Sequence, residues 1–168
     1  MIVSEDMLID VVDALDAPIG TVRRSDALRR KVNFRVVHLF LFNDQGELLI
    51  QQLAASRDRH PGAWGSSVAG YLFAGETYMQ AANRRLSQEL GVQTVLQAYG
   101  KTTMNDEGCT KFITLYLGTC NGPFTYDHEH IANLEFLGLP ALRSQRGTGE
   151  RRYTPTFLHV LNFYGHQA

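Results

Sequence analysis

Residues 70–92 read GYLFAGETYMQAANRRLSQELGV, and this stretch decides the fold. Apolar residues recur at helical spacing along its second half, at Met79, Ala82, Leu86 and Leu90. Thr77 stands where the N-terminus of a helix is capped, and Gly91 stands where a left-handed C-terminal residue is expected. The stretch therefore predicts a loop that contains Gly75, followed by a helix over residues 77–90.

One face of this predicted helix is the candidate site for chemistry. Residues 85, 88 and 89 are spaced i, i+3 and i+4, so their side chains share that face and can converge on one point. Carboxylates gathered in this way supply hard oxygen ligands to Mg²⁺. Here Arg85 and Gln88 occupy two of the three positions, and only Glu89 is acidic.

The spacing of the stretch resembles the Nudix box, the signature of the Nudix hydrolase superfamily. That signature runs Gly, five residues, Glu, seven residues, Arg-Glu, an aliphatic residue, any residue, Glu-Glu, any residue, Gly and an aliphatic residue. The residues that match its fixed positions are Gly70, Glu76, Arg84, Leu86, Glu89, Gly91 and Val92. The resemblance implies an α/β Nudix fold, in which a mixed β-sheet is sandwiched between helices.

Segments outside the box resemble one branch of the superfamily, which contains the type I isopentenyl diphosphate isomerases and related Nudix hydrolases. This resemblance covers roughly residues 8–163. The matching segments are residues 9–12, 19–22, 35–38, 42–43, 46, 48–49 and 61–64. The first two of these segments also indicate an additional N-terminal β-hairpin, which a generic Nudix domain does not need.

The rest of the chain divides into predicted strands and one further helix. Residues 7–12 and 19–22 alternate with turn residues as a hairpin does, and the continuous apolar run 36–42 predicts a central strand buried on both faces. The other predicted elements are a return strand at 47–52, strands at 94–98, 111–119 and 134–137, and a helix at 156–164. We expect one domain, with the hairpin and a basic connector over residues 1–34 and the Nudix core over residues 35–168.

The resemblance also implies roles for residues of the box. Glu89 and the backbone carbonyl of Gly70 are the implied ligands of Mg²⁺ or Mn²⁺, and Glu76 and Arg84 are the implied structural pair. The implied reaction is metal-dependent hydrolysis of a diphosphate linkage, in a nucleoside diphosphate or in one joined to another moiety. The expected ligand is thus a small-molecule diphosphate or nucleotide.

Arg85 and Gln88 depart from this pattern, because both replace acidic residues of the catalytic face. The formal charge of the three positions changes from −3 to 0, and a guanidinium donates hydrogen bonds and repels a cation. We therefore expect the metal to bind weakly without substrate. An alternative stays open, in which the fold keeps its cleft for a nucleotide or diphosphate and acts as a catalytically weakened binding module.

Isomerase activity is the less favoured alternative. The isomerase pattern needs a cysteine just before the box glycine and a histidine just after it, where this chain has Ala69 and Tyr71. The upstream histidine ligand of the isomerases falls near Phe34, and their paired glutamates fall near Cys109 and Lys111. The acid–base pair of the isomerases is therefore missing.

Other candidate residues have a functional and a structural interpretation. Glu129 falls where related hydrolases carry an acidic loop residue that approaches the metal or acts as a base, but it also fits a solvated loop. The candidates for substrate binding are Trp64, Tyr71, Phe73 and Arg35, although a tryptophan after Pro-Gly is more often a core residue.

Several further polar residues are better explained by structure. His128 and His130 suggest a transition-metal pair, yet loop histidines more often bind no metal. Asp106 and Glu107 have the chemistry of a turn. The interior candidates are His38, as a hydrogen-bonded group of an apolar strand, and Cys109, as a structural thiol.

Composition excludes several classes of partner. Sixteen Lys and Arg against 17 Asp and Glu give a net charge of −1, so no global field favours nucleic acid or an anionic membrane. The apolar runs are too short for a membrane helix. Two cysteines and the polar residues 1–6 indicate a reducing cytoplasm without a leader. A homodimer is a possible assembly.

Overall fold

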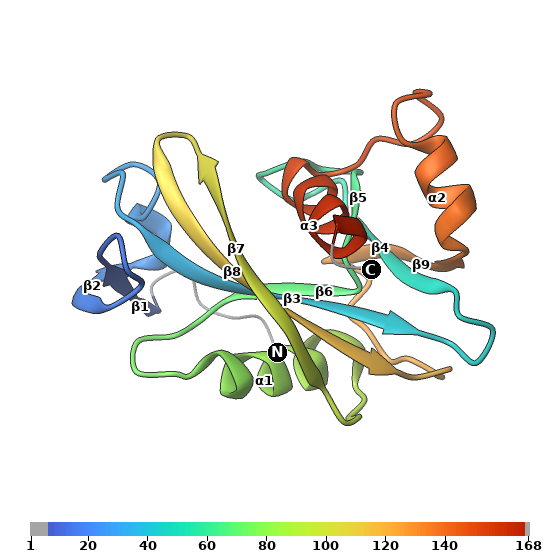
Figure 1. Cartoon of the computed structure of the whole chain (residues 1–168), viewed down its shortest axis with the longest axis horizontal. Coiled ribbons are helices and arrows are strands. Elements are labelled where there is room, and N and C mark those ends of the chain that lie inside the picture. Colours follow the sequence, from blue (N-terminus) through green and yellow to red (C-terminus); the bar gives the residue numbers. More distant parts are fainter. Residues whose placement is uncertain (1–6, 167–168) are drawn as a thin grey trace.

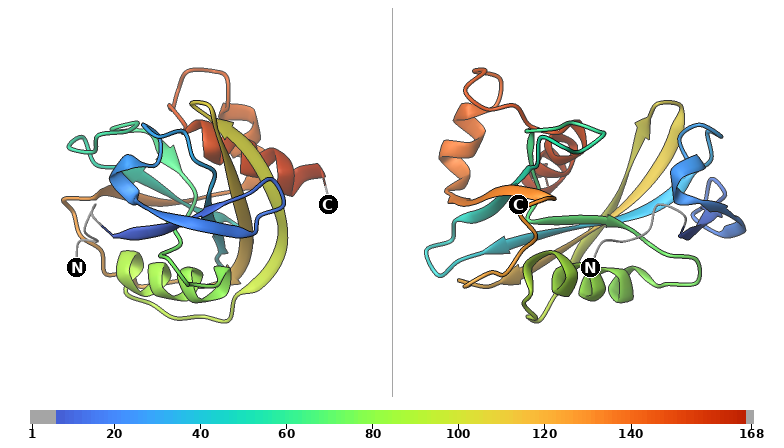
Figure 2. Two further views of the ribbon diagram at one scale, coloured as in Figure 1. Left: turned by 90° about the vertical axis from the view of Figure 1, so that its left-hand side faces the viewer. Right: turned by 180° about the vertical axis from the view of Figure 1, so that it is seen from behind.

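The computed structural model describes residues 7–166, so residues 1–6, on which the expectation of no leader rests, lie outside the described residues. In chain order the described elements are β1 (Leu8–Val12), β2 (Pro18–Arg23), η1 (Arg24–Asp26), β3 (Phe34–Phe42), β4 (Leu48–Leu53), β5 (Trp64–Gly65), β6 (Val68–Tyr71), α1 (Tyr78–Leu90), β7 (Gln97–Asp106), β8 (Cys109–Thr119), β9 (Ile131–Leu137), α2 (Leu139–Gln145) and α3 (Pro155–His166). A mixed sheet lies between α1 and α3 (Figure 1), and the turned views of Figure 2 agree. The mixed α/β fold and the N-terminal hairpin β1–β2 are confirmed.

Strand β3 is the centre of the sheet. It runs parallel to β8 and antiparallel to β6, and β7 extends the sheet beyond β8. Residues 36–41 of β3 are buried, as their apolar run predicts for a strand covered on both faces. The strand begins two residues earlier than predicted, at Phe34, whose ring is fully buried.

Strand β4 leaves β3 directly after the turn that joins them. The two strands pair only at Phe42 and Leu48, and β4 continues by pairing with β5 and β9. The predicted return strand thus forms, but it does not pair along the length of β3, because β6 takes the antiparallel place beside β3. The sheet consequently opens between the pair β3–β6 and the pair β4–β5.

Two apolar cores cover the opposite faces of the sheet. One core includes Phe40 of β3 and Phe157 of α3, and the other includes Leu39 of β3 and Leu86 of α1. Burying one such side chain stabilises the fold by about 1.5–3 kcal/mol. None of the described helices is long and apolar enough to cross a membrane.

Helix α1 forms where its sequence predicts. Thr77 Oγ1 accepts a hydrogen bond from the backbone N of Gln80 at 3.1 Å, and the Gln80 side chain accepts one from the backbone N of Thr77 at 2.9 Å. Gly91 ends the helix in the left-handed region at φ 66°, which glycine adopts without strain. Met79, predicted on the apolar stripe, is 39% exposed instead.

The N-terminal hairpin is fixed to the sheet and to α1 through Asp16. The Asp16 carboxylate accepts hydrogen bonds from Arg35 Nε at 2.7 Å, from the Tyr78 hydroxyl at 2.8 Å and from Lys101 Nζ. Arg35 therefore holds the hairpin, and its expected role in substrate binding stays a prediction. Asp10 of the same hairpin accepts a hydrogen bond from the backbone N of Gly75 at 3.1 Å, so the hairpin also contacts the loop before α1.

Three segments differ from the prediction. The strand expected at residues 94–98 begins only at Gln97 and continues to Asp106. Val95 is 88% exposed, so its apolar side chain is not part of a buried strand face. The sequence of β7 is mostly polar, so it lacks the apolar alternation by which a strand is recognised. The short elements η1 and α2 were not predicted, because neither carries a long apolar period.

Candidate active site

Glu76 and Arg84 join the loop before α1 to the helix itself. Arg84 Nε and Nη2 donate to the two carboxylate oxygens of Glu76 at 2.7 and 2.9 Å. Glu76 also accepts a hydrogen bond from the backbone N of Phe73 at 2.6 Å, and Arg84 donates to the Tyr71 carbonyl at 3.0 Å. The predicted contact is present, and its bidentate geometry fixes the loop against α1.

Glu89 is the one carboxylate of the predicted catalytic face, and both of its oxygens are hydrogen-bonded. Oε1 accepts from Gln51 Nε2 at 3.0 Å, and Oε2 accepts from Arg85 Nη2. Gln51 stands on β4 and also donates to the Ser67 carbonyl at 3.0 Å, which holds its amide in place. The sequence did not single out Gln51, because a lone glutamine in an apolar strand carries no motif.

Arg85 lies along Gly70 of β6. A Cβ atom added to Gly70 would lie 2.4 Å from Arg85 Nε and 2.8 Å from its Cδ. Arg85 Nη2 also donates to the Ala69 carbonyl at 3.3 Å, while the buried Nε has no hydrogen-bond partner among the described residues. A buried donor without a partner is a candidate for contact with a ligand.

Gln88 is directed to Arg84 rather than to Glu89. Its Oε1 accepts a hydrogen bond from Arg84 Nη1 at 3.2 Å, across the i, i+4 spacing of the helix. The amide oxygen of Gln88, the neutral oxygen that this position could offer to a metal, is therefore bonded to a guanidinium.

One more arginine, Arg57, lies within electrostatic range of Glu89. Arg57 belongs to the loop between β4 and β5, residues 54–63, which we call the β4–β5 loop. Burial lowers the pKa of Arg57, nearby Glu89 raises it, and nearby Arg85 and Arg24 lower it further. Two arginines, Arg85 and Arg24, lie within electrostatic range of Arg57, so positive charge gathers beside the Arg85–Glu89 pair in a chain whose net charge is −1.

The sequence model of the NUDIX domain family matches residues 32–157 of the chain. The chain belongs to the Nudix family. It is 30% identical to an uncharacterized Nudix hydrolase of Pseudomonas aeruginosa, over 96% of this chain and 95% of that protein. It is 32% identical to an isopentenyl-diphosphate Delta-isomerase of Streptomyces avermitilis, over 80% of this chain and 72% of that protein. A crystal structure from Deinococcus radiodurans matches with a TM-score of 0.81 at 25% identity, covering 94% of this chain and 99% of that chain.

Nudix hydrolases generally use a divalent metal such as Mg²⁺ or Mn²⁺. The donor set of this Nudix box does not fit a resident ion, because both Glu89 oxygens are bonded to donors and Arg85 brings a positive charge onto Gly70. No group of three or more His, Cys, Asp or Glu side chains that fits a metal occurs within residues 7–166. The box of this Nudix protein is therefore an arginine–glutamate pair rather than a carboxylate cluster.

The three aromatic candidates do not form one platform in this part of the chain. Each ring faces a different guanidinium, with centroid distances of 4.4 Å for Trp64 and Arg151, 4.5 Å for Tyr71 and Arg24, and 3.6 Å for Phe73 and Arg84. Trp64 packs against the core on the α3 side, which fits its interpretation as a core residue. Phe73 packs on Arg84, the partner of Glu76, and Tyr71 packs on Arg24.

Glu129 lies in an exposed turn beside the β4–β5 loop. Its backbone carbonyl accepts a hydrogen bond from Ser56 Oγ at 3.0 Å, whereas its carboxylate forms no hydrogen bond or ion pair within residues 7–166. Nearby His130 Nε2 lies 3.8 Å from Asp127, and the His128 ring packs on Tyr126. These contacts fit the solvated-loop interpretation better than a base or a metal pair.

His38 and Cys109 are interior groups, as their structural interpretation predicts. His38 Nδ1 and Ser66 Oγ share a hydrogen bond at 2.7 Å. Burial lowers the pKa of His38 to about 3, and the positive charges of Lys111 and His159 contribute. Burial raises the pKa of the Cys109 thiol, so this cysteine is not an activated nucleophile.

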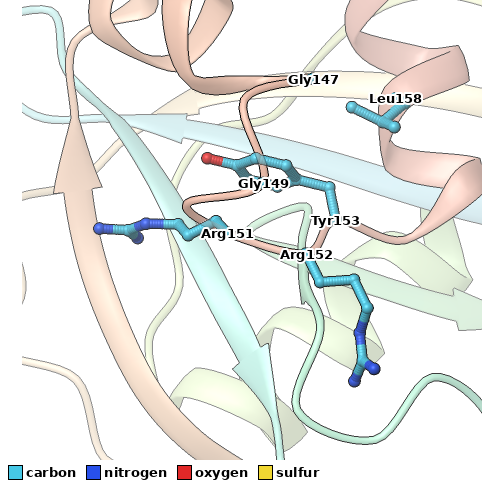
Figure 3. Close-up of a pocket in the computed structure, with 6 residues that line it drawn as sticks. All are labelled: Gly147, Gly149, Arg151, Arg152, Tyr153 and Leu158. Atoms are coloured by element: carbon cyan, nitrogen blue, oxygen red, sulfur yellow. The ribbon is translucent and has the colours of Figure 1, made fainter.

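A cavity of about 490 Å³ lies apart from the Nudix box, on the connector between α2 and α3 (Figure 3). Its lining residues are Gly147, Gly149, Arg151, Arg152, Tyr153 and Leu158. Figure 3 shows the Arg151 side chain directed away from Leu158. Arg151 Nη2 forms an ion pair with Glu135 Oε2 at 2.5 Å. We assign no chemistry to this cavity.

Proposed function

We propose that this Nudix protein binds a small molecule that carries a diphosphate group, beside Arg85 and Glu89, and hydrolyses its diphosphate linkage. The observation that supports this best is the position of Arg85, which lies against Gly70, bonds Glu89 and has a buried Nε without a hydrogen-bond partner among the described residues, with Arg57 in electrostatic range. Guanidinium groups bind phosphate oxygens through paired, charge-assisted hydrogen bonds. A diphosphate would neutralise the local excess of positive charge, and a nucleoside diphosphate or a compound built on one has the required group.

Each residue then has a defined role. Arg85 moves its hydrogen bonds from Glu89 to phosphate oxygens when the substrate binds, and Arg57 contacts the same diphosphate. Glu89, released from Arg85, accepts a proton from the attacking water. The water oxygen forms a bond to phosphorus while the bridging phosphorus–oxygen bond breaks, and the arginines stabilise the negative charge on the departing phosphate ester.

We propose that a divalent ion reaches this site as a complex with the diphosphate substrate. The ion is then part of the substrate, and the protein does not need a metal site of its own. This keeps the expectation of weak Mg²⁺ or Mn²⁺ binding without ligand, since Glu89 alone offers a carboxylate and its oxygens are already bonded. Cytoplasmic location, supported by the free thiols of Cys109 and Cys120, remains part of the proposal.

The test is phosphate or monophosphate release from a panel of nucleoside diphosphates and linked diphosphates in the presence of Mg²⁺. We expect turnover by the wild type and a loss of about 100-fold or more in Glu89→Gln, which keeps the side-chain shape but removes the proton acceptor. Glu47→Gln is the matched control, because Glu47 lies in the β3–β4 turn and bonds Asn43. Equal rates in wild type and Glu89→Gln would contradict the role of Glu89.

A binding module without turnover is the second candidate function. The observation that favours it is that both carboxylate oxygens of Glu89 already accept hydrogen bonds, from Gln51 and Arg85. A panel ligand that raises the melting temperature but releases no phosphate would support this candidate. Isomerase activity has less support, because Ala69 and Tyr71 stand where the isomerases need an acid–base pair. Lys111, which falls near one of the paired glutamates of the isomerases, is bonded to Asp106.

A further inference from the structure

Asp106 joins the β4–β5 loop to the far end of the sheet. Arg59 Nη1 and Nη2 donate to the two carboxylate oxygens of Asp106 at 3.3 and 3.0 Å. Asp106 ends β7, directly before the turn formed by Glu107 and Gly108, which both have positive φ. The expected turn is present, but the aspartate does more than shape it, because its side chain bonds a loop that is 47 residues away in sequence.

The Asp106 carboxylate is itself anchored in the interior. Lys111 Nζ donates to Asp106 at 2.9 Å and to Thr156 Oγ1 of α3 at 2.7 Å. Side-chain exposure is 8% for Lys111, 11% for Asp106 and 41% for Arg59. Burial raises the pKa of Asp106, but hydrogen bonds from Arg59 and Lys111 outweigh it and hold the pKa below its ordinary value. The carboxylate is therefore a fixed anion to which the loop is attached.

The ends of the β4–β5 loop are held by other contacts. Gly62 N donates to the Leu53 carbonyl at 3.0 Å and closes the base of the loop, and Ala54 N donates to the His130 carbonyl at 3.0 Å. Arg59 connects the tip of the loop to β7, two residues after Arg57. The position of Arg57 near Glu89 is thus coupled to the attachment of Arg59.

We propose that Asp106 is a positioning residue that, through Arg59, holds the β4–β5 loop so that Arg57 stays beside the Arg85–Glu89 pair. This inference rests on the proposed function, in which Arg57 contacts the diphosphate. The rival interpretation is that Arg59 binds the anion directly and Asp106 merely competes for it. The two interpretations predict opposite signs for the loss of the Asp106 charge.

The test measures the binding of inorganic pyrophosphate by calorimetry at constant ionic strength. Arg59→Gln and Asp106→Asn should each weaken binding by about fivefold, the scale of one partly exposed ion pair. Arg59→Lys should restore part of the loss because it keeps the charge. Tighter binding by Asp106→Asn, together with weaker binding by Arg59→Gln, would overturn the proposal in favour of direct contact by Arg59.

A second measurement follows the loop without any ligand. Trypsin cleavage after Arg57 should be several times faster in Arg59→Gln and Asp106→Asn than in wild type, because the tip of the loop is released. Asp44→Asn is the matched control, since Asp44 lies in the distant β3–β4 turn and bonds Asn121. Arg59→Gln leaves the Asp106–Lys111 pair intact, so unchanged cleavage in this variant refutes the positioning role even where Asp106→Asn is unfolded by an unpaired buried lysine.

The two measurements separate this inference from the proposed function. If Arg57→Gln binds pyrophosphate as tightly as wild type, the proposed function fails, and with it the role of the loop in anion binding. If Arg57→Gln binds more weakly but the Arg59 and Asp106 variants change neither affinity nor cleavage, the proposed function stands and the positioning role is refuted.

Discussion

Arg85 donates a hydrogen bond to Glu89 one helical turn further along α1, and the same arginine side chain lies against Gly70. The contact explains two departures of the box together. The guanidinium that replaces an acidic residue neutralises the remaining carboxylate, and it covers the glycine whose carbonyl was expected to bind metal. In the proposed function, this contact is the reason why the site favours an anion over a cation.

The contact between Arg85 and Gly70 predicts a coupled effect on stability. Gly70→Ala places a Cβ atom 2.4 Å from Arg85 Nε and 2.9 Å from its Cγ, so the arginine must move. We expect Gly70→Ala to lower the free energy of unfolding by about 1–3 kcal/mol, measured by urea denaturation. In the Arg85→Ala background the same change should cost much less, because the clashing atoms are gone. An equal cost in both backgrounds would show that Arg85 does not lie over Gly70.

The buried ring of His38 predicts a pH dependence of stability. Burial lowers the pKa of folded His38 to about 3, whereas an unfolded histidine has a pKa near 6.5, so unfolding takes up a proton between these values. This contribution to the free energy of unfolding therefore falls as the pH drops below 6.5, by about 1.4 kcal/mol per pH unit.

Comparison of wild type with His38→Gln isolates that contribution. Between pH 6 and 4.5, the free energy of unfolding of His38→Gln should depend on pH less steeply than that of wild type. The difference should approach about 1.4 kcal/mol per pH unit, which corresponds to the uptake of one proton on unfolding. In the folded wild type, the nuclear magnetic resonance signal of the His38 ring should not titrate above pH 4.5. A titration midpoint of about 6 for this ring would contradict the interior, neutral histidine.

Local sequence signals predict the parts of this fold that depend on periodicity and capping. Helix α1, with Thr77 and Gly91 at its ends, and the buried run of β3 are of this kind. The Glu76–Arg84 contact was also predictable, because the Nudix spacing specifies both residues. The early end of the β3–β4 ladder was not, since β6 competes for the same edge of β3 from about 30 residues away.

The partners of the site residues were less predictable than the residues themselves. Glu89 was identified from its helix position, but Gln51 on β4 and Arg57 in a loop reach it only through the tertiary fold. Arg35 was expected at the substrate, and it binds Asp16 because the hairpin packs across that end of the sheet. Neither pairing leaves a periodic signal in the chain.

Restoring the acidic face should create a metal site. We expect the ligand-free wild type to bind Mg²⁺ no more tightly than about the millimolar range, since one hydrogen-bonded carboxylate leaves most of the octahedral sphere to water. Arg85→Glu combined with Gln88→Glu should bind Mg²⁺ at least about tenfold more tightly, because three carboxylates then share one helical face. Calorimetry gives both constants. Micromolar binding by the wild type would instead point to ligands other than Glu89.

The central claim is that the box face binds a diphosphate through arginines without a resident metal, and pyrophosphate binding in the presence of a chelator tests it most directly. Calorimetry on the wild type with excess EDTA should show binding, and Arg85→Gln should weaken it by about tenfold, equivalent to roughly 1.4 kcal/mol. Arg29→Gln is the matched control, because Arg29 forms an exposed ion pair with Asp26. Pyrophosphate binding that is equally tight in wild type and Arg85→Gln would contradict the account.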